Sequence, residues 1–176
     1  MNYHKIEKTS VANGTGIRVV LWVSGCSLHC KGCHNPETWD LNSGKLFDES
    51  AKRELFETLD KPYIQGITFS GGHPLENENI ETVYLLIKEI KEKFPTKDIW
   101  LYTGFTLEQI FPTVVTDDFN LSRFYRQKIV EMCDVIVDGK YIEELKDITL
   151  KWKGSSNQRV IDIQKSFKER KIVLYN

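Results

Sequence analysis

Short apolar runs that end near glycine recur along the chain and predict buried β-strands. They are rich in Val, Ile and aromatic residues, and they cover residues 17–23, 67–70, 99–103 and 135–138. Nearly continuous apolar runs of this length are typical of strands that a parallel sheet buries on both faces. We therefore expect these segments to form the centre of one sheet.

Segments with helical periodicity lie between these runs. Apolar residues recur every three or four positions in 48–59, 76–93 and 121–132, which predicts amphipathic helices. Thr106 and Gln109 have the spacing of a capping box, so we expect a short helix that begins there and ends near Pro112.

The alternation of strands and helices predicts the fold class. It is typical of right-handed βαβ units and hence of an α/β fold with a mainly parallel sheet. A chain of 176 residues is too short for a full eight-stranded barrel, which takes about 250 residues. We expect one domain over residues 1–176 with an open, partial (β/α) barrel.

Composition limits the function more than it changes the fold. The 24 Lys and Arg residues against 25 Asp and Glu give a formal net charge of −1, which argues against a protein that holds nucleic acid mainly by charge. No apolar stretch approaches the roughly 20 residues of a membrane span, and the first residues carry no apolar run of signal-peptide type. We expect a soluble, cytoplasmic protein with neither nucleic acid nor a membrane as partner.

Three of the four cysteines lie close together after the first predicted strand, with the spacing Cys26-x3-Cys30-x2-Cys33. Without a secretory signal, such a group indicates a metal or cluster site rather than a disulfide framework. Structural zinc sites usually take four ligands in two separated pairs, so three thiolates on one loop favour a [4Fe–4S] cluster with one iron left open. The alternative is a zinc site whose fourth ligand is Cys133, His29 or His34.

Glycine and polar residues follow the other predicted strands as well. These are Gly71-Gly72, Thr103-Gly104 and Asp138-Gly139-Lys140. Ligands of parallel α/β sheets bind at the carboxyl ends of the strands. The sequence therefore predicts that these residues and the three cysteines meet at one edge of the sheet.

The cysteine spacing resembles the signature of the radical S-adenosylmethionine enzymes, although Gly32 stands where many members have an aromatic residue. Within that superfamily, the chain is similar to the activating components of anaerobic ribonucleotide reductase. The similar segments are 13–16, 23–26, 32–35, Trp39, 70–75, 97–100, 102–104, 137–140 and 152–158. The resemblance covers about residues 1–160, except for an insertion-like stretch at 114–125.

This resemblance implies an enzyme. Family members bind the amino and carboxylate groups of S-adenosylmethionine at the open iron, and an electron from the reduced cluster cleaves it to methionine and a 5′-deoxyadenosyl radical. The radical abstracts a hydrogen atom from a glycine Cα of the large subunit of anaerobic ribonucleoside-triphosphate reductase. The electron would come from a donor such as a flavodoxin.

The same resemblance assigns roles to individual residues. Cys26, Cys30 and Cys33 would ligate the cluster. Gly32 and His34 would lie beside the nucleoside, as neighbours of the last ligand.

Further roles follow for residues after the second and fourth predicted strands. Gly71 and Gly72, which lack Cβ atoms, would let the backbone approach the methionine end of the cofactor, and the alternative is a plain turn. Lys140 would neutralise the cofactor carboxylate and Asp138 would meet a hydroxyl or the ammonium, unless the two form only a solvated ion pair. His73 stands where the family usually has Asp or Glu.

Other interpretations stay open. Cys133 is most simply a small buried residue, residues 13–16 could form only a hairpin turn, and no mechanical role is evident for residues 152–158. For the whole chain, the alternatives are an activating enzyme of another glycyl-radical enzyme of the pyruvate formate-lyase type, or a non-catalytic zinc or electron-transfer module.

Overall fold

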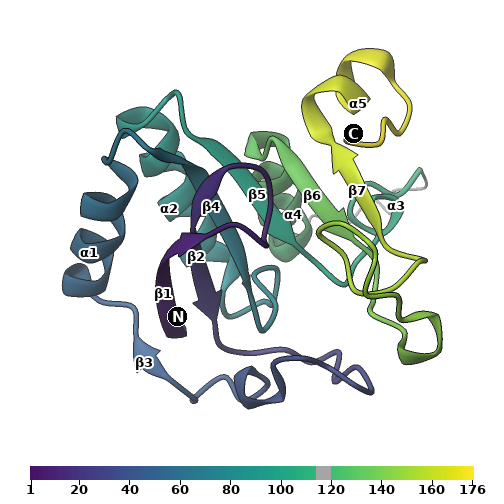
Figure 1. Cartoon of the computed structure of the whole chain (residues 1–176), viewed down its shortest axis with the longest axis horizontal. Helices are drawn as coiled ribbons and strands as arrows, with labels where there is room; N and C mark the ends of the chain where they lie inside the picture. The colour runs from purple at the N-terminus through teal and green to yellow at the C-terminus, as the bar shows by residue number, and fades with distance from the viewer. Residues whose placement is uncertain (114–119) are drawn as a thin grey trace.

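A computed structural model of the protein describes residues 1–113 and 120–176, and their strands form one sheet (Figure 1). The sheet has the order β3-β1-β2-β4-β5-β6-β7. The strands are β1 (Asn2–Ser10), β2 (Ile17–Val23), β3 (Lys45–Leu46), β4 (Ile64–Gly71), β5 (Asp98–Tyr102), β6 (Val135–Asp138) and β7 (Arg159–Asp162).

The centre of the sheet is parallel and its margins are antiparallel. The neighbours β2, β4, β5 and β6 pair in parallel, whereas β1, β3 and β7 pair antiparallel with their neighbours. The four strands predicted from apolar runs are those of the parallel centre, so this part of the prediction is confirmed. The α/β class is also confirmed, but the sheet is mixed rather than mainly parallel.

The four predicted helices lie close to their expected positions, and a fifth, at residues 163–169, was not predicted. They are α1 (Glu49–Leu59), α2 (Ile80–Lys93), α3 (Leu107–Ile110), α4 (Leu121–Met132) and α5 (Ile163–Glu169). Asp48 caps α1 by accepting the N–H of Ala51, and the capping box of Thr106 and Gln109 is formed at α3. The insertion-like stretch at 114–125 contains the start of α4, and its residues 114–119 lie outside the described part of the chain.

The second predicted helix begins four residues later than expected. Residues 76–79 form a turn in which the Glu76 N–H donates to the His73 carbonyl and the Asn79 N–H to the Glu76 carbonyl. The periodic apolar residues that predicted this helix lie within α2 (Ile80–Lys93). Residues 72–79 therefore form a separate turn between β4 and α2.

The two faces of the sheet have different chemistry. Helices α1, α2 and α4 pack on one face (Figure 1) around a core of strand residues that include Val19, Leu21, Ile67, Phe69, Ile99 and Leu101. The alternate positions on the other face carry polar and aromatic side chains, among them Arg18, Trp22, Thr68, Ser70, Trp100 and Tyr102. Because side chains alternate along a strand, this second face offers polar groups to a site.

The antiparallel margins carry weak sequence signals. In β1, apolar residues are mixed with Lys and Glu, and the strand is held by pairing with β2 across residues 11–16. Residues 13–16 therefore lie in the connection of a hairpin, although Asn13 also lines a cavity at the carboxyl ends of the parallel strands. The other margin, β7, is extended by the C-terminal residues, because the Asp162 N–H donates to the Val173 carbonyl and the Tyr175 N–H to the Val160 carbonyl.

Within the described residues, the helices are all too short or too polar to cross a membrane.

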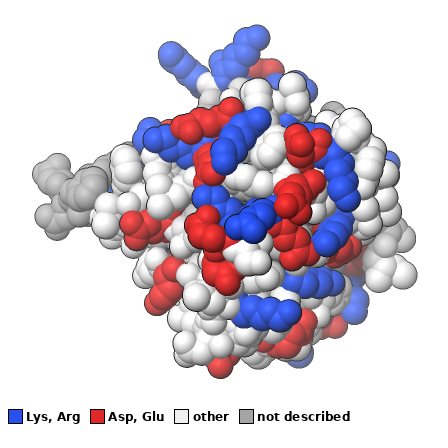
Figure 2. Space-filling view, turned by 90° about the vertical axis from the view of Figure 1, so that its left-hand side faces the viewer, with Lys and Arg blue, Asp and Glu red and all other residues white. Residues whose placement is uncertain are grey.

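On the face that α1 covers, basic and acidic side chains are interspersed (Figure 2). Ion pairs there include Lys8–Glu54 at 2.9 Å and Lys52–Glu89 at 2.5 Å.

Candidate cluster site

The cysteine loop, residues 24–35, follows β2 and is anchored at its beginning by backbone hydrogen bonds. The Gly25 N–H donates to the Thr38 carbonyl at 2.7 Å and the Cys26 N–H to the Trp39 carbonyl at 3.0 Å. Further along, the Cys33 N–H donates to the Cys30 carbonyl at 3.1 Å. These bonds turn the loop so that its three half-buried free thiols line one cavity.

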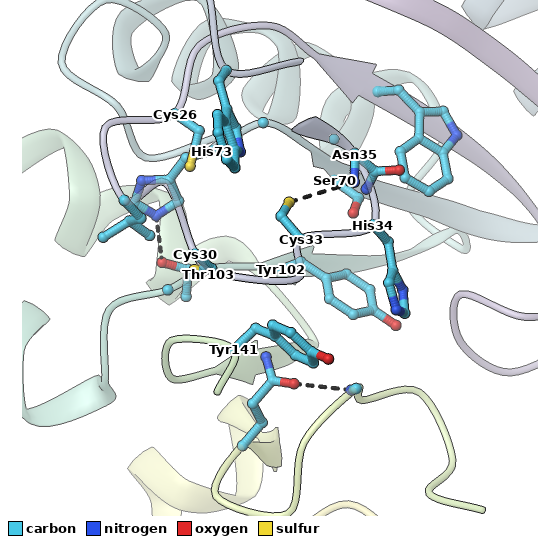
Figure 3. Close-up of a pocket in the computed structure, with 18 of the residues that line it drawn as sticks. Cys26, Cys30, Cys33, His34, Asn35, Ser70, His73, Tyr102, Thr103 and Tyr141 are labelled. Carbon is cyan, nitrogen blue, oxygen red and sulfur yellow. Dashed lines mark hydrogen bonds between the residues drawn. The ribbon is translucent and has the colours of Figure 1, made fainter. Parts of the chain in front are cut away.

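The three cysteines face a cavity of about 440 Å³ at the carboxyl edge of the parallel strands (Figure 3). Residues that follow β4, β5 and β6 line the same cavity, as the sequence predicted. In addition to Cys26, Cys30 and Cys33, the lining includes Gly71, Gly72, His73, Thr103, Gly104 and Gly139. The convergence of four strand ends on one cavity is therefore confirmed, but of Asp138, Gly139 and Lys140 only Gly139 lines it.

Burial and a nearby lysine act on the thiols in opposite directions. Burial raises the pKa of Cys26, and it also raises the pKa of Cys30, where the ammonium of Lys140 offsets part of the effect. The Asn35 N–H donates to the Cys33 sulfur at 3.4 Å. Because metal ligands must be thiolates, loading this site would release protons, and the ammonium of Lys140 favours the charged form of Cys30.

The donor set fits an iron–sulfur cluster. Three free thiols face one cavity, and the indole N–H of Trp39, which also lines it, is buried without a hydrogen-bond partner among the described residues. Leaving such a donor unpaired costs about 1–3 kcal/mol, and cluster sulfurs accept hydrogen bonds from the protein.

The zinc alternative requires a fourth ligand beside the three cysteines. In residues 1–113 and 120–176 no three His, Cys, Asp or Glu side chains, the cysteines included, already surround a single ion, so this finding does not separate zinc from a cluster. His29 packs on Trp39 and His34 on Tyr141, with ring centroids 4.7 and 5.8 Å apart.

Cys133, the remaining fourth-ligand candidate, is fully buried in the core at the end of α4. It precedes β6, whereas the cavity lies beyond the end of that strand at Gly139. At about 3.3 Å per residue, the two positions are roughly 20 Å apart. Burial raises the pKa of the Cys133 thiol, so the structure places it as a small core residue.

Gly71 and Gly72 line the cavity, and internal packing alone already demands glycine there. A Cβ on Gly71, whose φ is +106°, would lie 2.6 Å from the Val23 carbonyl oxygen, and one on Gly72 would lie 2.5 Å from the Gly25 carbonyl oxygen. The two glycines thus let the turn after β4 approach the start of the cysteine loop.

His73 is buried at the wall of the cavity, where the resemblance led us to expect an acidic residue. Its Nε2 lies 2.9 Å from the Thr103 hydroxyl, and its Nδ1 lies 3.3 Å from a carboxylate oxygen of Glu76. A carboxylate is therefore present near this position, supplied by Glu76.

Asp138 and Lys140 diverge at the end of β6. Gly139 has a φ of +93°, so the two side chains do not share one side as residues of a regular strand would. The Asp138 carboxylate accepts the N–H of Leu107 at 2.8 Å and the Nε–H of Arg159 at 3.0 Å. Lys140 is exposed and acts on the Cys30 thiol instead. The alternative of an Asp138–Lys140 ion pair is therefore wrong.

The residues beside the last cysteine contact the segment after β6. Gly32 is exposed, has a φ of +72°, and packs against the Glu143 side chain. Among the described residues that line the cavity, His34 is present and Gly32 is not. Tyr141, also in the lining, donates its hydroxyl hydrogen to Glu143 at 2.6 Å.

The segment 152–158, for which the sequence suggested no mechanical role, forms part of the cavity wall. The Gln158 side-chain oxygen accepts the N–H of Gly154 at 2.9 Å, and its amide donates to the Gly139 carbonyl at 3.0 Å. The Tyr102 hydroxyl donates to the Trp152 carbonyl at 2.7 Å. These bonds tie the segment to the ends of β5 and β6.

Sequence reasoning missed several side chains that line the cavity. Trp22, Ser70 and Tyr102 lie at the carboxyl ends of their strands, on the face opposite the helices. Side chains of a strand alternate between the two faces of the sheet. Each of these three residues directly follows a core residue of the helix face, so the alternation could have placed it on the opposite face.

Comparisons with known proteins agree with the chemistry of this cavity. A family model described as a 4Fe-4S single cluster domain matches residues 12–161. The anaerobic ribonucleoside-triphosphate reductase-activating protein of Escherichia coli (strain K12) is 39% identical over 162 residues, which cover 91% of this chain and 97% of that protein. Its namesake from Enterobacteria phage T4 is 41% identical over 160 residues, covering 91% and 93%. A third, from Vibrio cholerae, is 39% identical over 160 residues, covering 90% and 96%.

Proposed function

The chain belongs to the family of anaerobic ribonucleoside-triphosphate reductase-activating proteins, and we propose that it activates such a reductase by generating a glycyl radical on it. The family's 4Fe-4S single cluster domain spans residues 12–161. The observation that carries the proposal is the position of three free thiols of one loop at a cavity formed by four strand ends.

Cys26, Cys30 and Cys33 are the proposed ligands of a [4Fe–4S] cluster, with S-adenosylmethionine as cosubstrate. When bound, the cluster would supply the electron that cleaves S-adenosylmethionine to methionine and a 5′-deoxyadenosyl radical. Three protein ligands leave one iron for the cosubstrate. The protein binds and orients the reactants and excludes water from them.

The proposed cosubstrate contacts come from the loops around the cysteines. His34, Gly71 and Gly72 line the cavity and are proposed to contact the cosubstrate directly. Lys140, whose charge acts on the Cys30 thiol, is proposed to neutralise the carboxylate of S-adenosylmethionine.

Gly32 and Asp138 are proposed to act indirectly. Gly32 allows the φ of +72° that precedes Cys33. Asp138 is engaged by Arg159 and by the N–H of Leu107, so its proposed role is to fix the end of β6 beneath the cavity.

Anaerobic reconstitution tests this function directly. The reconstituted protein should hold about four irons per chain, give a reduced-cluster electron paramagnetic resonance signal that changes on adding S-adenosylmethionine, and form 5′-deoxyadenosine under a reductant. Mixed with an anaerobic ribonucleoside-triphosphate reductase, it should produce a glycyl radical signal. A Cys30→Ala variant is the control, because it removes one proposed ligand and should abolish all four results.

Two results would contradict the proposal. A spectrum that S-adenosylmethionine leaves unchanged would point to the non-catalytic electron-transfer module. A radical on a pyruvate formate-lyase but none on the reductase would point to the other glycyl-radical substrate.

Several finer statements are parts of the same proposal, supported by the family resemblance. The open sheet is proposed to be a partial (β/α) barrel of the radical S-adenosylmethionine type, and residues 1–176 are proposed to form one such domain. The proposed electron donor is a flavodoxin, and the proposed location is the cytoplasm.

A further inference from the structure

The turn between β4 and α2, residues 72–79, holds the beginning of the cysteine loop. The Gly72 N–H donates to the Val23 carbonyl at 2.8 Å and the His73 N–H to the Gly25 carbonyl at 2.7 Å. The Asn79 side-chain amide donates to the Ser24 carbonyl at 2.8 Å. These bonds fix the chain up to the residue before Cys26.

Glu76 continues this attachment beyond Cys26. One of its carboxylate oxygens accepts both the backbone N–H of Ser27 at 2.8 Å and the Ser27 hydroxyl at 2.7 Å. Its side chain is only 12% exposed, whereas Ser27 is exposed, so the two bonds lie at the protein surface. Cys26 is therefore bracketed by residues that one turn holds on both sides.

His73 orients the Glu76 carboxylate from the cavity wall. An ionised carboxylate only accepts hydrogen bonds, so His73 donates from Nδ1 across the 3.3 Å contact. In the neutral ring Nε2 is then an acceptor, and the Thr103 hydroxyl, 2.9 Å away, donates to it while accepting the N–H of Phe105 at 3.1 Å. Both ring nitrogens of His73 and the Thr103 hydroxyl therefore have partners of matching kind.

The contacts join loops that follow three strands: Ser27 after β2, Glu76 and His73 after β4, and Thr103 after β5. His73 and Thr103 lie beside Cys26 and Cys30 at one side of the cavity (Figure 3). Both are buried, with exposed fractions of 1% and 4%. The connection is thus part of the wall that faces the proposed cluster.

We infer that Glu76 is a positioning residue of the cysteine loop, which its carboxylate, oriented by His73, fixes at Ser27 so that Cys26 faces the cavity. The inference rests on the proposed function for the identity of the group that Cys26 holds. The attachment itself is a property of the chain without its cofactor. Charge-assisted hydrogen bonds of this kind are about twice as strong as neutral ones.

Amide hydrogen exchange of the cofactor-free protein tests the attachment. In Glu76→Ala, Ser27 loses its acceptor, and exchange in a peptide covering residues 24–30 should accelerate about tenfold. Glu76→Gln retains an acceptor oxygen and should stay within about threefold of the unmodified protein. The matched control is Glu78→Ala, which removes a negative charge two residues after Glu76. The Glu78 side chain is exposed and has no ion-pair or hydrogen-bond partner in the described residues.

Unchanged exchange in a folded Glu76→Ala variant, or equal acceleration in Glu78→Ala, would overturn the inference. If Glu76→Ala does not fold, Ser27→Ala replaces it, since it removes only the hydroxyl donor and leaves Glu76 and His73 in contact. That variant should accelerate exchange about threefold, and no acceleration would count against the inference.

Iron release provides the second readout. After reconstitution, Glu76→Ala should lose iron to a chelator about five- to tenfold faster than the unmodified protein, with Glu78→Ala unchanged. A Glu76→Ala rate equal to that of Glu78→Ala would contradict the positioning role. If the unmodified protein takes up no cluster, the proposed function fails, and the exchange experiment still decides whether Glu76 fixes the loop.

Discussion

The absence of a Cβ atom controls how closely two loops approach at the cavity. Gly72 lies where an added Cβ would meet the backbone carbonyl oxygens of Gly25 and Thr38, at 2.5 and 2.9 Å. Both neighbours are backbone atoms and cannot rotate away as a side chain could. The residues that hold Cys26 in place therefore depend on glycine at this one position.

Gly72→Ala should lower the free energy of unfolding by about 2–4 kcal/mol, because the overlap forces the cysteine loop away from β4. Urea unfolding of the cofactor-free protein measures this. Gly154→Ala is the control, since its Cβ would meet side chains rather than backbone, the Tyr141 ring at 3.1 Å and the Gln158 oxygen at 3.7 Å, and should cost less than about 1 kcal/mol. Equal losses in both variants would contradict the argument.

Cys133 provides a second prediction at this scale. Cys133→Ala removes a buried sulfur far from the cavity, so it should cost about 1 kcal/mol of stability and leave the iron content after reconstitution unchanged. Iron analysis beside a Cys33→Ala variant, which should lose its iron, checks this. A fall to background in Cys133→Ala would overturn the assignment of the three ligands.

The short helix α3 is stabilised by charged partners from neighbouring elements rather than by its own length. Helix α3 spans only Leu107–Ile110, too short to be stable alone. Its first N–H is bound by the Asp138 carboxylate, and Arg159 at the start of β7 joins Asp138 to Glu108 of the same helix. The two carboxylates raise the pKa of Arg159. This network connects α3, β6 and β7.

Asp138→Asn should therefore destabilise the cofactor-free protein. Asp138 is 1% exposed but its partner Arg159 is 30% exposed, so the cost should be about 2 kcal/mol, below the roughly 3 kcal/mol for breaking a fully buried ion pair from one side. Arg159→Met should cost a similar amount, and the double variant should cost less than the sum because both remove the same interaction. Thermal unfolding of the three variants measures this.

The same variants separate the two roles considered for Asp138. If it holds the end of β6, binding of S-adenosylmethionine by the reconstituted Asp138→Asn protein should weaken only as much as in Arg159→Met. A loss confined to Asp138→Asn would instead favour direct contact with the cosubstrate.

In the described part of the molecule many acidic residues form ion pairs, Glu76 and Glu108 among them, and their protonation should contribute to acid unfolding. Hydrogen bonding to His73, together with the Ser27 N–H and hydroxyl, lowers the pKa of Glu76 to about 2 from an ordinary value of 4.5. Hydrogen bonds from Arg159 lower the pKa of Glu108 to about 2 as well. Both groups prefer the charged form in the folded state.

A lowered folded-state pKa adds stability that is complete above the unfolded value and is lost as the pH falls. The free energy of unfolding should therefore decrease between about pH 4.5 and pH 2. Glu76→Gln should reduce this decrease by about 1–2 kcal/mol, because it removes one of the titrating groups. Urea unfolding at a series of pH values, with Glu78→Ala as control, measures the difference. A Glu76→Gln profile parallel to that of the unmodified protein would contradict it.

The sequence by itself determined the parallel centre of the sheet, most helices and the cysteine site. Apolar runs that end at glycine mark strands buried on both faces, and a capping box or apolar residues recurring every three or four positions mark a helix locally. The three cysteines lie within one loop, and the carboxyl ends of neighbouring parallel strands must share one edge. None of these inferences needs knowledge of distant contacts.

Only the tertiary structure decided the rest. Strand β1 mixes charged and apolar residues and becomes a strand through its pairing with β2, and β7 depends likewise on β6 and the C-terminal residues. The partners of Asp138, His73 and Glu76 lie 21, 30 and 49 positions away along the chain. Side-chain partners at such separations are set by packing and by the turn at Gly139, because local periodicity specifies which face a residue occupies but not which distant group meets it there.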